Sequence, residues 1–211
     1  MAVIKFVVVL LIGYLIGSFN TSIVIGKIRG IDIRKHGSGN AGLTNTYRVL
    51  GTLDSVLVIF GDVIKGVLAV YLGKYLWSLA GTTSGFGMLI GGLGAIIGHN
   101  FPIYFNFRGG KGILTTGAVL ACINIKIALV LFTFFVLVVV VTKYVSLGSV
   151  MSAVLLPVVV AVLDKSTDKK YFLIWSIIVM VSALVRHKEN IFRLMSGTET
   201  QFSLKRKKRK C

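Results

Sequence analysis

The sequence predicts an all-α, polytopic integral membrane protein of about seven transmembrane helices, and three observations support this. The 211 residues are 55% hydrophobic, with a mean hydropathy of +0.86, whereas soluble domains are about 45–50% apolar. The apolar residues form long runs, several of them near the roughly 20 residues that cross a bilayer core. Most basic residues lie between these runs or in the tail at Lys205–Lys210. Lipid is therefore the solvent that the apolar excess fits.

The apolar runs give the expected spans in order. The first run follows Lys5 and lacks a small-residue cleavage site at its end, so we interpret it as a retained helix rather than a signal peptide. The third and fourth spans are glycine-rich or short, which is typical of tilted, interrupted or closely packed helices. The spans are expected at residues 3–25, 54–73, 82–98, 112–124, 126–142, 147–163 and 171–186. They form one transmembrane domain, 1–200, followed by a basic tail, 201–211.

The basic residues near the spans predict the orientation, because positively charged loops stay on the cytoplasmic side. With the N-terminus outside and the C-terminus inside, seventeen Lys and Arg residues fall on the inner side and six on the outer side. Without the tail the bias is still eleven to six. In this orientation every unusual polar loop lies on the cytoplasmic face, where the three loops could converge on one site.

The first polar loop has the composition of an anion-binding nest. Glycines from Gly37 to Gly42 let successive backbone N–H groups turn toward one centre, and Arg48 adds a guanidinium suited to phosphate oxygens. The alternative is a tight, capped turn that leads into the second helix. The candidate ligands in this loop are Gly37, Ser38, Gly39, Asn40, Gly42, Thr44, Asn45 and Arg48.

The second polar loop carries Arg108-Gly-Gly-Lys-Gly112. It lacks the GxxxxGK[ST] spacing of a nucleotide phosphate loop, and no strand precedes it. Gly110 and Lys111 can nevertheless present N–H groups and an ammonium to an anion at the start of a helix. The alternative is an interfacial lysine that snorkels to water.

The third polar loop contains His187 and Asn190, three residues apart and on one helix face if the last span continues past Val185. They suit a polyol or its phosphate, and the alternative is ordinary surface polarity at a helix end. Asp62 and Lys65 are also three apart, within the second span, where charges are costly unless paired. We interpret them as a structural ion pair that supports the first loop; the alternative is a direct role in ligand binding.

The sequence also lacks several reaction signatures. There is no G-x-S-x-G nucleophile elbow and no H-E-x-x-H zinc motif, and none of the three histidines has an aspartate five residues later. Cys122 and Cys211 form neither a metal-binding spacing nor a disulfide framework. We therefore expect no metal and no cofactor.

Four segments occur together, in order and spacing, over nearly the whole chain. They are Gly17-Ser-Phe-Asn20, Gly37-Ser-Gly-Asn-Ala-Gly-Leu-Thr-Asn45 with Arg48, Gly98-His-Asn-Phe-Pro102 through Lys111-Gly112, and Arg186-His-Lys-Glu-Asn-Ile-x-Arg-Leu-x-x-Gly-x-Glu199. Together they resemble the bacterial membrane acyl-phosphate:glycerol-3-phosphate acyltransferases of the PlsY type. The departures are small: Leu43 and Thr46 stand where the family more often has alanine and valine, and the basic tail exceeds the family core.

The resemblance implies transfer of a fatty acyl group from acyl phosphate to the sn-1 hydroxyl of glycerol 3-phosphate, giving lysophosphatidate and phosphate. It implies a seven-helix, N-out, C-in protein of the bacterial cytoplasmic (inner) membrane with a cytoplasmic site. The implied partners are glycerol 3-phosphate, a long-chain acyl phosphate, membrane lipids and the enzyme that supplies the acyl phosphate, with no nucleic acid. The implied catalytic residues are Lys111, Arg48, Ser38 and His187, and the implied substrate-binding residues are Gly37, Gly39, Asn40, Gly42, Thr44, Asn45, Gly110 and Asn190.

Because an acyl phosphate is already activated, positioning and charge neutralisation suffice for its transfer. We expect direct attack, with a substrate phosphate oxygen taking the hydroxyl proton; the competing version makes His187 the general base. Two functions of other classes fit parts of the sequence. A transporter for a phosphorylated anion should show an inverted repeat and polar residues at mid-membrane, and a lipid-binding scaffold would use the Lys205–Lys210 cluster but leave the three polar loops unexplained.

Overall fold

The computed structural model describes residues 2–79 and 85–202, and in this part of the chain the protein is helical with no strand. This confirms the all-α prediction. The helices are α1 (Ala2–Gly17), α2 (Thr21–Ile28), α3 (Leu43–Val49), α4 (Thr52–Ser78), α5 (Phe86–Asn100), α6 (Ile113–Ile123), α7 (Ile125–Thr142), α8 (Val145–Leu163), α9 (Lys169–Arg186) and α10 (Lys188–Met195), with 3-10 turns η1 (Ile33–Lys35) and η2 (Ile103–Phe105).

Five helical segments of the described chain are long and apolar enough to cross a membrane, and α9 with α10 adds a sixth if that bent pair is one span. The segment expected at 112–124 forms α6, an apolar helix of 11 residues. The third expected span begins at 82, and residues 82–84 lie outside the described chain. The number of spans and the orientation of the two ends stay predictions.

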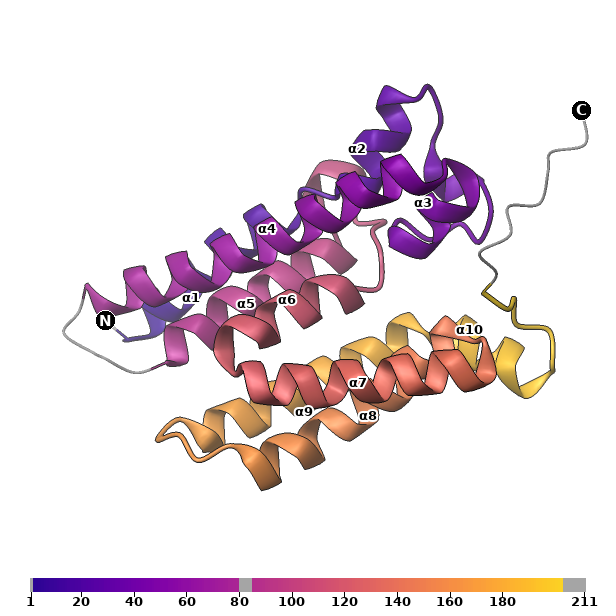
Figure 1. The fold of residues 1–211 in the computed structure, drawn as a ribbon. Coiled ribbons are helices and arrows are strands. Elements are labelled where there is room, and N and C mark those ends of the chain that lie inside the picture. Colours follow the sequence, from indigo (N-terminus) through magenta and orange to yellow (C-terminus); the bar gives the residue numbers. More distant parts are fainter. Residues whose placement is uncertain (1, 80–84, 203–211) are drawn as a thin grey trace, which may run out of the picture.

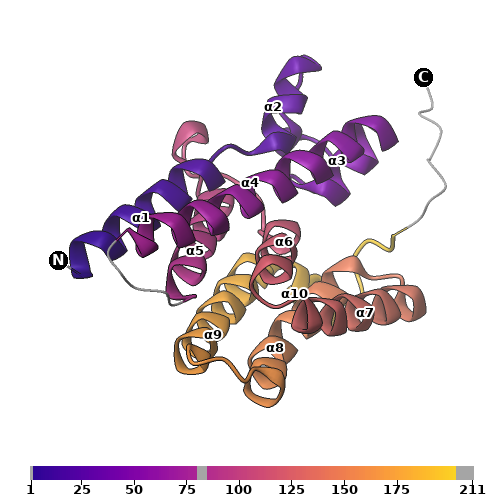
Figure 2. The ribbon, with the colours of Figure 1, turned by 60° about the vertical axis from the view of Figure 1, so that its left-hand side comes forward.

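The helices form two groups that both ribbon views separate (Figures 1 and 2). Helices α1, α4 and α5 pack together in one group, and α7, α8 and α9 form the other. Helix α6 contacts α4, α5 and α7, so it joins the groups. The short helices α2, α3 and α10 lie at the same end of the long ones, opposite the N-terminus (Figure 1). The first polar loop connects α2 to α3, the second connects α5 to α6, and the third polar segment includes α10.

Small residues let the backbones of α1, α4 and α5 approach closely. A Cβ atom placed on Gly91 of α5 would lie 2.2 Å from the Ala69 carbonyl oxygen of α4. On Gly94 it would lie 2.4 Å from the Leu10 carbonyl oxygen of α1. Close packing through glycine is a common way for transmembrane helices to associate, and it confirms the close packing expected of the glycine-rich third span.

Apolar side chains lie both in the buried core and on the outer surface, as expected of a protein that is surrounded by lipid. Buried residues from both groups, including Val70, Val119 and Leu156, form one apolar cluster. Large apolar side chains such as Phe132 and Leu137 on α7 are 64% and 58% exposed. An exposed apolar face of this length fits contact with lipid rather than water.

Candidate active site

The break between α1 and α2 is built by Asn20, whose side chain is fully buried. Its Oδ1 accepts a hydrogen bond from the Ile23 N–H at 3.1 Å and so caps α2. Its Nδ2 donates to the Ala41 carbonyl oxygen at 3.3 Å. One amide therefore caps the start of α2 and holds the first polar loop against it.

Lys65 of α4 lies almost fully buried beneath this break. Its Nζ contacts Asp62 Oδ1 at 2.8 Å, the Phe19 carbonyl oxygen at 3.1 Å and His99 Nδ1 at 2.9 Å. Because an ammonium only donates, we assign the His99 proton to Nε2. The Asp62–Lys65 ion pair is confirmed; its contacts run to the α1–α2 break and to α5 rather than directly to the first loop.

The first polar loop turns at two glycines with left-handed backbones, Gly37 at φ 61° and Gly39 at φ 71°, as a nest requires. Gly42 differs, because its φ of −168° is ordinary extended backbone. Part of the nest is also used within the loop, since the Ser38 N–H donates to Asn45 Oδ1 and the Gly39 N–H donates to the His36 carbonyl. The predicted nest is therefore only partly available to a ligand.

Asn45 holds the first polar loop together through three hydrogen bonds. Its side chain is buried, and its Nδ2 donates to the carbonyl oxygens of Ile33 at 3.1 Å and His36 at 3.0 Å. Its Oδ1 accepts from the Ser38 N–H at 2.8 Å. Both amide hydrogens are therefore used to hold the loop, and the predicted role of Asn45 toward a ligand stays a prediction.

The second polar loop touches the first at Gly110. A Cβ atom there would lie 2.4 Å from the Ala41 carbonyl oxygen and 2.2 Å from His99 Nε2, so only glycine fits. Arg34 adds a second link, because its Nη1 donates to the Phe105 carbonyl oxygen at 2.9 Å. The glycine at position 110 thus permits contact between the two loops, and the guanidinium of Arg34 stabilises it.

The third polar segment is bent. Helix α9 ends at Arg186, and α10 starts at Lys188 with a bend of 61° between them. The expectation that one continuous helix carries His187 and Asn190 is therefore wrong. His187 caps the junction, with its Nδ1 2.8 Å from the Ala183 carbonyl oxygen, and Asn190 lies on α10.

Arg186, at the end of α9, joins the third segment to the second loop. Its Nε donates to the Gly110 carbonyl oxygen at 3.0 Å, and its Nη2 donates to the Gly109 carbonyl oxygen at 3.2 Å. The three polar loops, which come from distant parts of the sequence, therefore meet at one end of the helices. This confirms the predicted convergence.

At the centre of the convergence, Lys111 of the second loop donates to Asn190 Oδ1 of α10. Asn190 Nδ2 in turn donates to Glu199 Oε1 at 2.8 Å. Glu199 also accepts from Arg193 Nε at 2.7 Å and from Ser146 Oγ at 2.9 Å. Lys111 and Asn190 are therefore directly linked, and Glu199 binds the pair to α8 and α10.

The electrostatics of this centre favour an anion. Burial lowers the pKa of Lys111 to about 8, against the opposing charge of Glu199. Burial also lowers the pKa of Arg48, on which Glu199 and Arg193 act as well. For Glu199, burial raises the pKa, but hydrogen bonds from Asn190, Arg193 and Ser146 outweigh it and hold the pKa below its usual range. Two carboxylates, Glu199 and Glu189, thus face a larger number of cations.

The other predicted ligands lie around this centre at various depths. His187 is buried, Arg48 and Thr44 are half-buried on α3, and Ser38 is exposed on the first loop. Within the described residues, no hydrogen bond joins the side chains of Ser38, Asn40 or Thr44 to Lys111. The roles of these side chains toward a ligand stay predictions.

Residue-by-residue reasoning did not assign roles to four residues of the site: Arg186, Arg193, Glu199 and Ser146. The Arg186–Glu199 pattern contained three of them, so the family-like spacing was the usable signal. Ser146 had no such signal, because a serine at the start of an apolar helix is common. Ser146 reaches the site only because the chain after α10 runs back past the start of α8, where Glu199 accepts from Ser146.

The fold and the site define a class of protein: a polytopic membrane protein with a cationic, carboxylate-poor site where three polar loops converge. The glycerol-3-phosphate acyltransferase family model matches residues 7–197, so the chain belongs to that family. This confirms the resemblance and makes the protein an integral membrane acyltransferase.

Several relatives share this assignment over most of their length. A glycerol-3-phosphate acyltransferase from Thermoanaerobacter sp. (strain X514) is 42% identical over 92% of this chain and 94% of its own. One from Halalkalibacterium halodurans is 44% identical over 92% and 93%. The crystal structure of the membrane acyltransferase PlsY in its glycerol 3-phosphate form is 31% identical, covers 94% of this chain and 96% of its own, and has a TM-score of 0.82.

The buried ion pair gives a stability prediction. Lys65→Met leaves the Asp62 carboxylate buried and unpaired, and we expect a loss of about 3–5 kcal/mol. Lys74→Met is the control on the same helix, because Lys74 is exposed, and it should unfold like the parent. Adding Asp62→Asn to Lys65→Met should recover much of the loss. Unfolding in detergent micelles measures all four proteins; a Lys65→Met protein as stable as the parent would contradict the structural role of the pair.

Proposed function

We propose that this enzyme transfers a fatty acyl group from a long-chain acyl phosphate to the sn-1 hydroxyl of glycerol 3-phosphate, releasing lysophosphatidate and inorganic phosphate. The observation that carries the proposal is the meeting of the three polar loops at one end of the helices. Lys111 lies near Arg186 there, and Arg48 and Arg193 lie in the field of Glu199. Two phosphate-bearing substrates suit this excess of positive charge.

The relatives support the choice of acceptor. Their solved structures are described as glycerol 3-phosphate and lysophosphatidic acid forms of PlsY, the substrate and product of such a transfer. Acyl phosphate as donor and the mechanism are our proposals. We also propose that residues 1–200 form the transmembrane domain, followed by a basic tail at 201–211. In this proposal the site faces the cytoplasm of a bacterial inner membrane, as the positive-inside bias indicates.

The proposed step needs no acyl-enzyme. The sn-1 oxygen attacks the acyl carbon, the bond from that carbon to the phosphate oxygen breaks, and phosphate leaves with the electron pair. The hydroxyl proton passes to a phosphate oxygen of the substrate. Glu199 is a poor base, because Asn190, Arg193 and Ser146 already donate to its two oxygens. Cations at the loops would stabilise the charge that develops on the leaving phosphate.

His187 supports a competing route. Since a carbonyl oxygen only accepts, the contact of Nδ1 with the Ala183 carbonyl assigns the proton to Nδ1 and leaves Nε2 as an acceptor. That acceptor would either orient the attacking hydroxyl or remove its proton. In our proposal it orients the hydroxyl, so His187→Gln should keep most of kcat and raise KM for glycerol 3-phosphate. A kcat lowered by about 10²-fold or more would instead favour the general-base route.

The choice of donor can be tested directly. We expect purified protein in detergent to release phosphate from palmitoyl phosphate only when glycerol 3-phosphate is present, and to leave palmitoyl-CoA unused. Lys111→Ala and Arg48→Ala should abolish release, whereas Lys74→Ala should not. A folded preparation that binds glycerol 3-phosphate but does not turn over acyl phosphate would refute this function and favour an anion transporter.

The lowered pKa of Lys111 predicts a pH dependence. Its ammonium is present below about pH 8 and is lost as the pH rises through that value. Glycerol 3-phosphate stays a dianion in this range, so kcat/KM for it should fall above about pH 8. Lys111→Arg keeps its charge to much higher pH. We expect that variant to be slower but to lack the alkaline fall, and the same alkaline fall in both proteins would exclude Lys111 as its cause.

A further inference from the structure

We propose that the loop Phe101–Arg108 is a lipid-insertion surface, whose apolar side chains enter the interfacial layer of the membrane and whose basic neighbours bind anionic phospholipid headgroups. The loop follows α5 and leads into the glycines before Lys111. Large apolar side chains dominate its outer surface: Ile103 is 46% exposed, Tyr104 54% and Phe107 56%. Side chains of this kind gain most by leaving water.

The loop holds these side chains outward in a fixed conformation. Its backbone is braced at 2.9 Å by the Phe107 N–H on the Pro102 carbonyl and by Arg34 Nη1 on the Phe105 carbonyl. Tyr14 Oη donates to the Phe101 carbonyl at 2.8 Å. A surface braced in this way is prepared for contact before any partner arrives.

The backbone of the loop is strained where it presents Phe107. Asn106 and Phe107 both have φ of 57°, in the left-handed region. Asparagine tolerates this region, but a bulky aromatic residue seldom adopts it. The strain gives no gain in burial, because Phe107 remains more than half exposed. Transfer of its ring into lipid would offset the cost.

The apolar surface of the loop continues the lipid-facing surface of α1. Leu11 and Leu15 of α1 are 52% and 44% exposed, and Phe19, just after the helix, is 51% exposed. The Ile103 N–H donates to Ser18 Oγ at 3.4 Å, so the loop lies against this end of α1. An apolar surface that continues a membrane-spanning face fits lipid better than a soluble partner.

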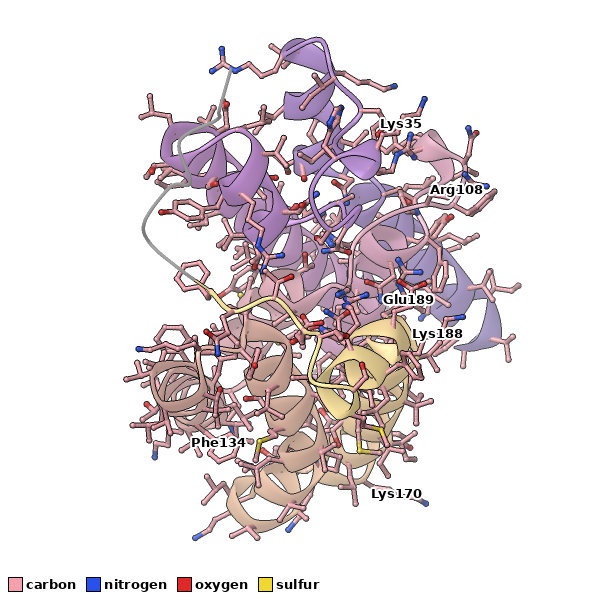
Figure 3. All side chains as sticks on the ribbon, turned by 90° about the vertical axis from the view of Figure 1, so that its right-hand side faces the viewer. Lys35, Arg108, Phe134, Lys170, Lys188 and Glu189 are labelled. Atoms are coloured by element: carbon pink, nitrogen blue, oxygen red, sulfur yellow. The ribbon has the colours of Figure 1, made fainter. Side chains whose placement is uncertain are left out.

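Basic side chains lie beside the apolar ones. Lys35 and Arg108 are exposed, and Figure 3, which looks onto the end of the helices that carries the site, shows them near each other at one edge. Lys27 Nζ lies 5.1 Å from the centre of the Phe105 ring. Aromatic and basic residues together are typical of the membrane interface, where the cations meet anionic headgroups.

Insertion of this loop would set the height of the site above the membrane. Gly109 and Gly110 follow directly after Arg108, and their carbonyl oxygens accept from Arg186. Phe107 and Lys111 are four residues apart, a separation that spans at most about 14 Å, so the depth of Phe107 limits the depth of Lys111. A reaction between a lipid-soluble and a water-soluble substrate requires such a position.

The test places a fluorescent probe on the loop of the full chain. In a Cys122→Ser, Cys211→Ser background, Phe107→Cys is labelled with NBD and reconstituted into vesicles of phosphatidylcholine with phosphatidylglycerol. Leu137→Cys on the exposed face of α7 is the lipid reference, and Glu189→Cys is the aqueous reference. We expect the probe at 107 to be quenched by doxyl-labelled lipid at least three-fold more than the probe at 189, with blue-shifted emission. Tyr104→Cys repeats the measurement if the first variant does not fold.

Quenching at 107 or 104 that equals the quenching at 189 would overturn the insertion and leave the loop as a docking surface for a soluble protein. The headgroup contact is tested separately by Lys35→Gln with Arg108→Gln. In the labelled Phe107→Cys protein, we expect stronger quenching in vesicles that contain phosphatidylglycerol than in vesicles of phosphatidylcholine alone. When Lys35→Gln and Arg108→Gln are added to this protein, we expect the same quenching in both kinds of vesicle. An equal increase in both proteins would refute the headgroup contact. Neither result depends on turnover, so both are independent of the proposed acyl transfer.

Discussion

The buried ion pair between Asp62 and Lys65 holds the α1–α2 break and the end of α5 at one point. A charge at this depth in a membrane helix is costly unless it is paired, and here the three donors of one ammonium meet three acceptors. Two of these acceptors lie close to the polar loops: the Phe19 carbonyl is at the α1–α2 break, and His99 is at the end of α5 that begins the second loop. The paired ammonium therefore positions the neighbouring backbone through directional hydrogen bonds. An apolar contact has no such direction and would not position the backbone in this way.

Close helix packing makes this constraint possible. Lys65 reaches both the α1–α2 break and α5 because glycines at α5 let α1 and α4 approach on either side. The lack of a side chain also permits a close contact at Gly110, where the second loop meets the first loop and His99. Glycine in this protein thus serves two distinct purposes: proximity between helices in the membrane, and proximity between loops at the site.

The sequence predicts the features that depend on composition and spacing. Long apolar runs identify the helices, the three-residue spacing of Asp62 and Lys65 identifies the ion pair, and the polar loops identify where the site lies. It does not predict the bend at His187, because neither proline nor glycine marks the position. That bend accompanies tertiary contacts from Arg186 to Gly109 and Gly110. The sequence also does not predict that Asn45 holds the first loop together, because composition counts donors but only the fold shows which carbonyls they meet.

The site carries more positive than negative charge, and this excess suits anionic ligands. Lys111, Arg48 and Arg193 lie in the field of Glu199, whose oxygens already accept three hydrogen bonds. Glu199, together with Glu189, neutralises only part of the positive charge of the site, and burial of Lys111 makes its ammonium costly. Bound phosphate groups would reduce both costs, so affinity for substrate and stability of the loops are coupled. A site balanced by its own carboxylates would be more stable when empty and would bind phosphate less tightly.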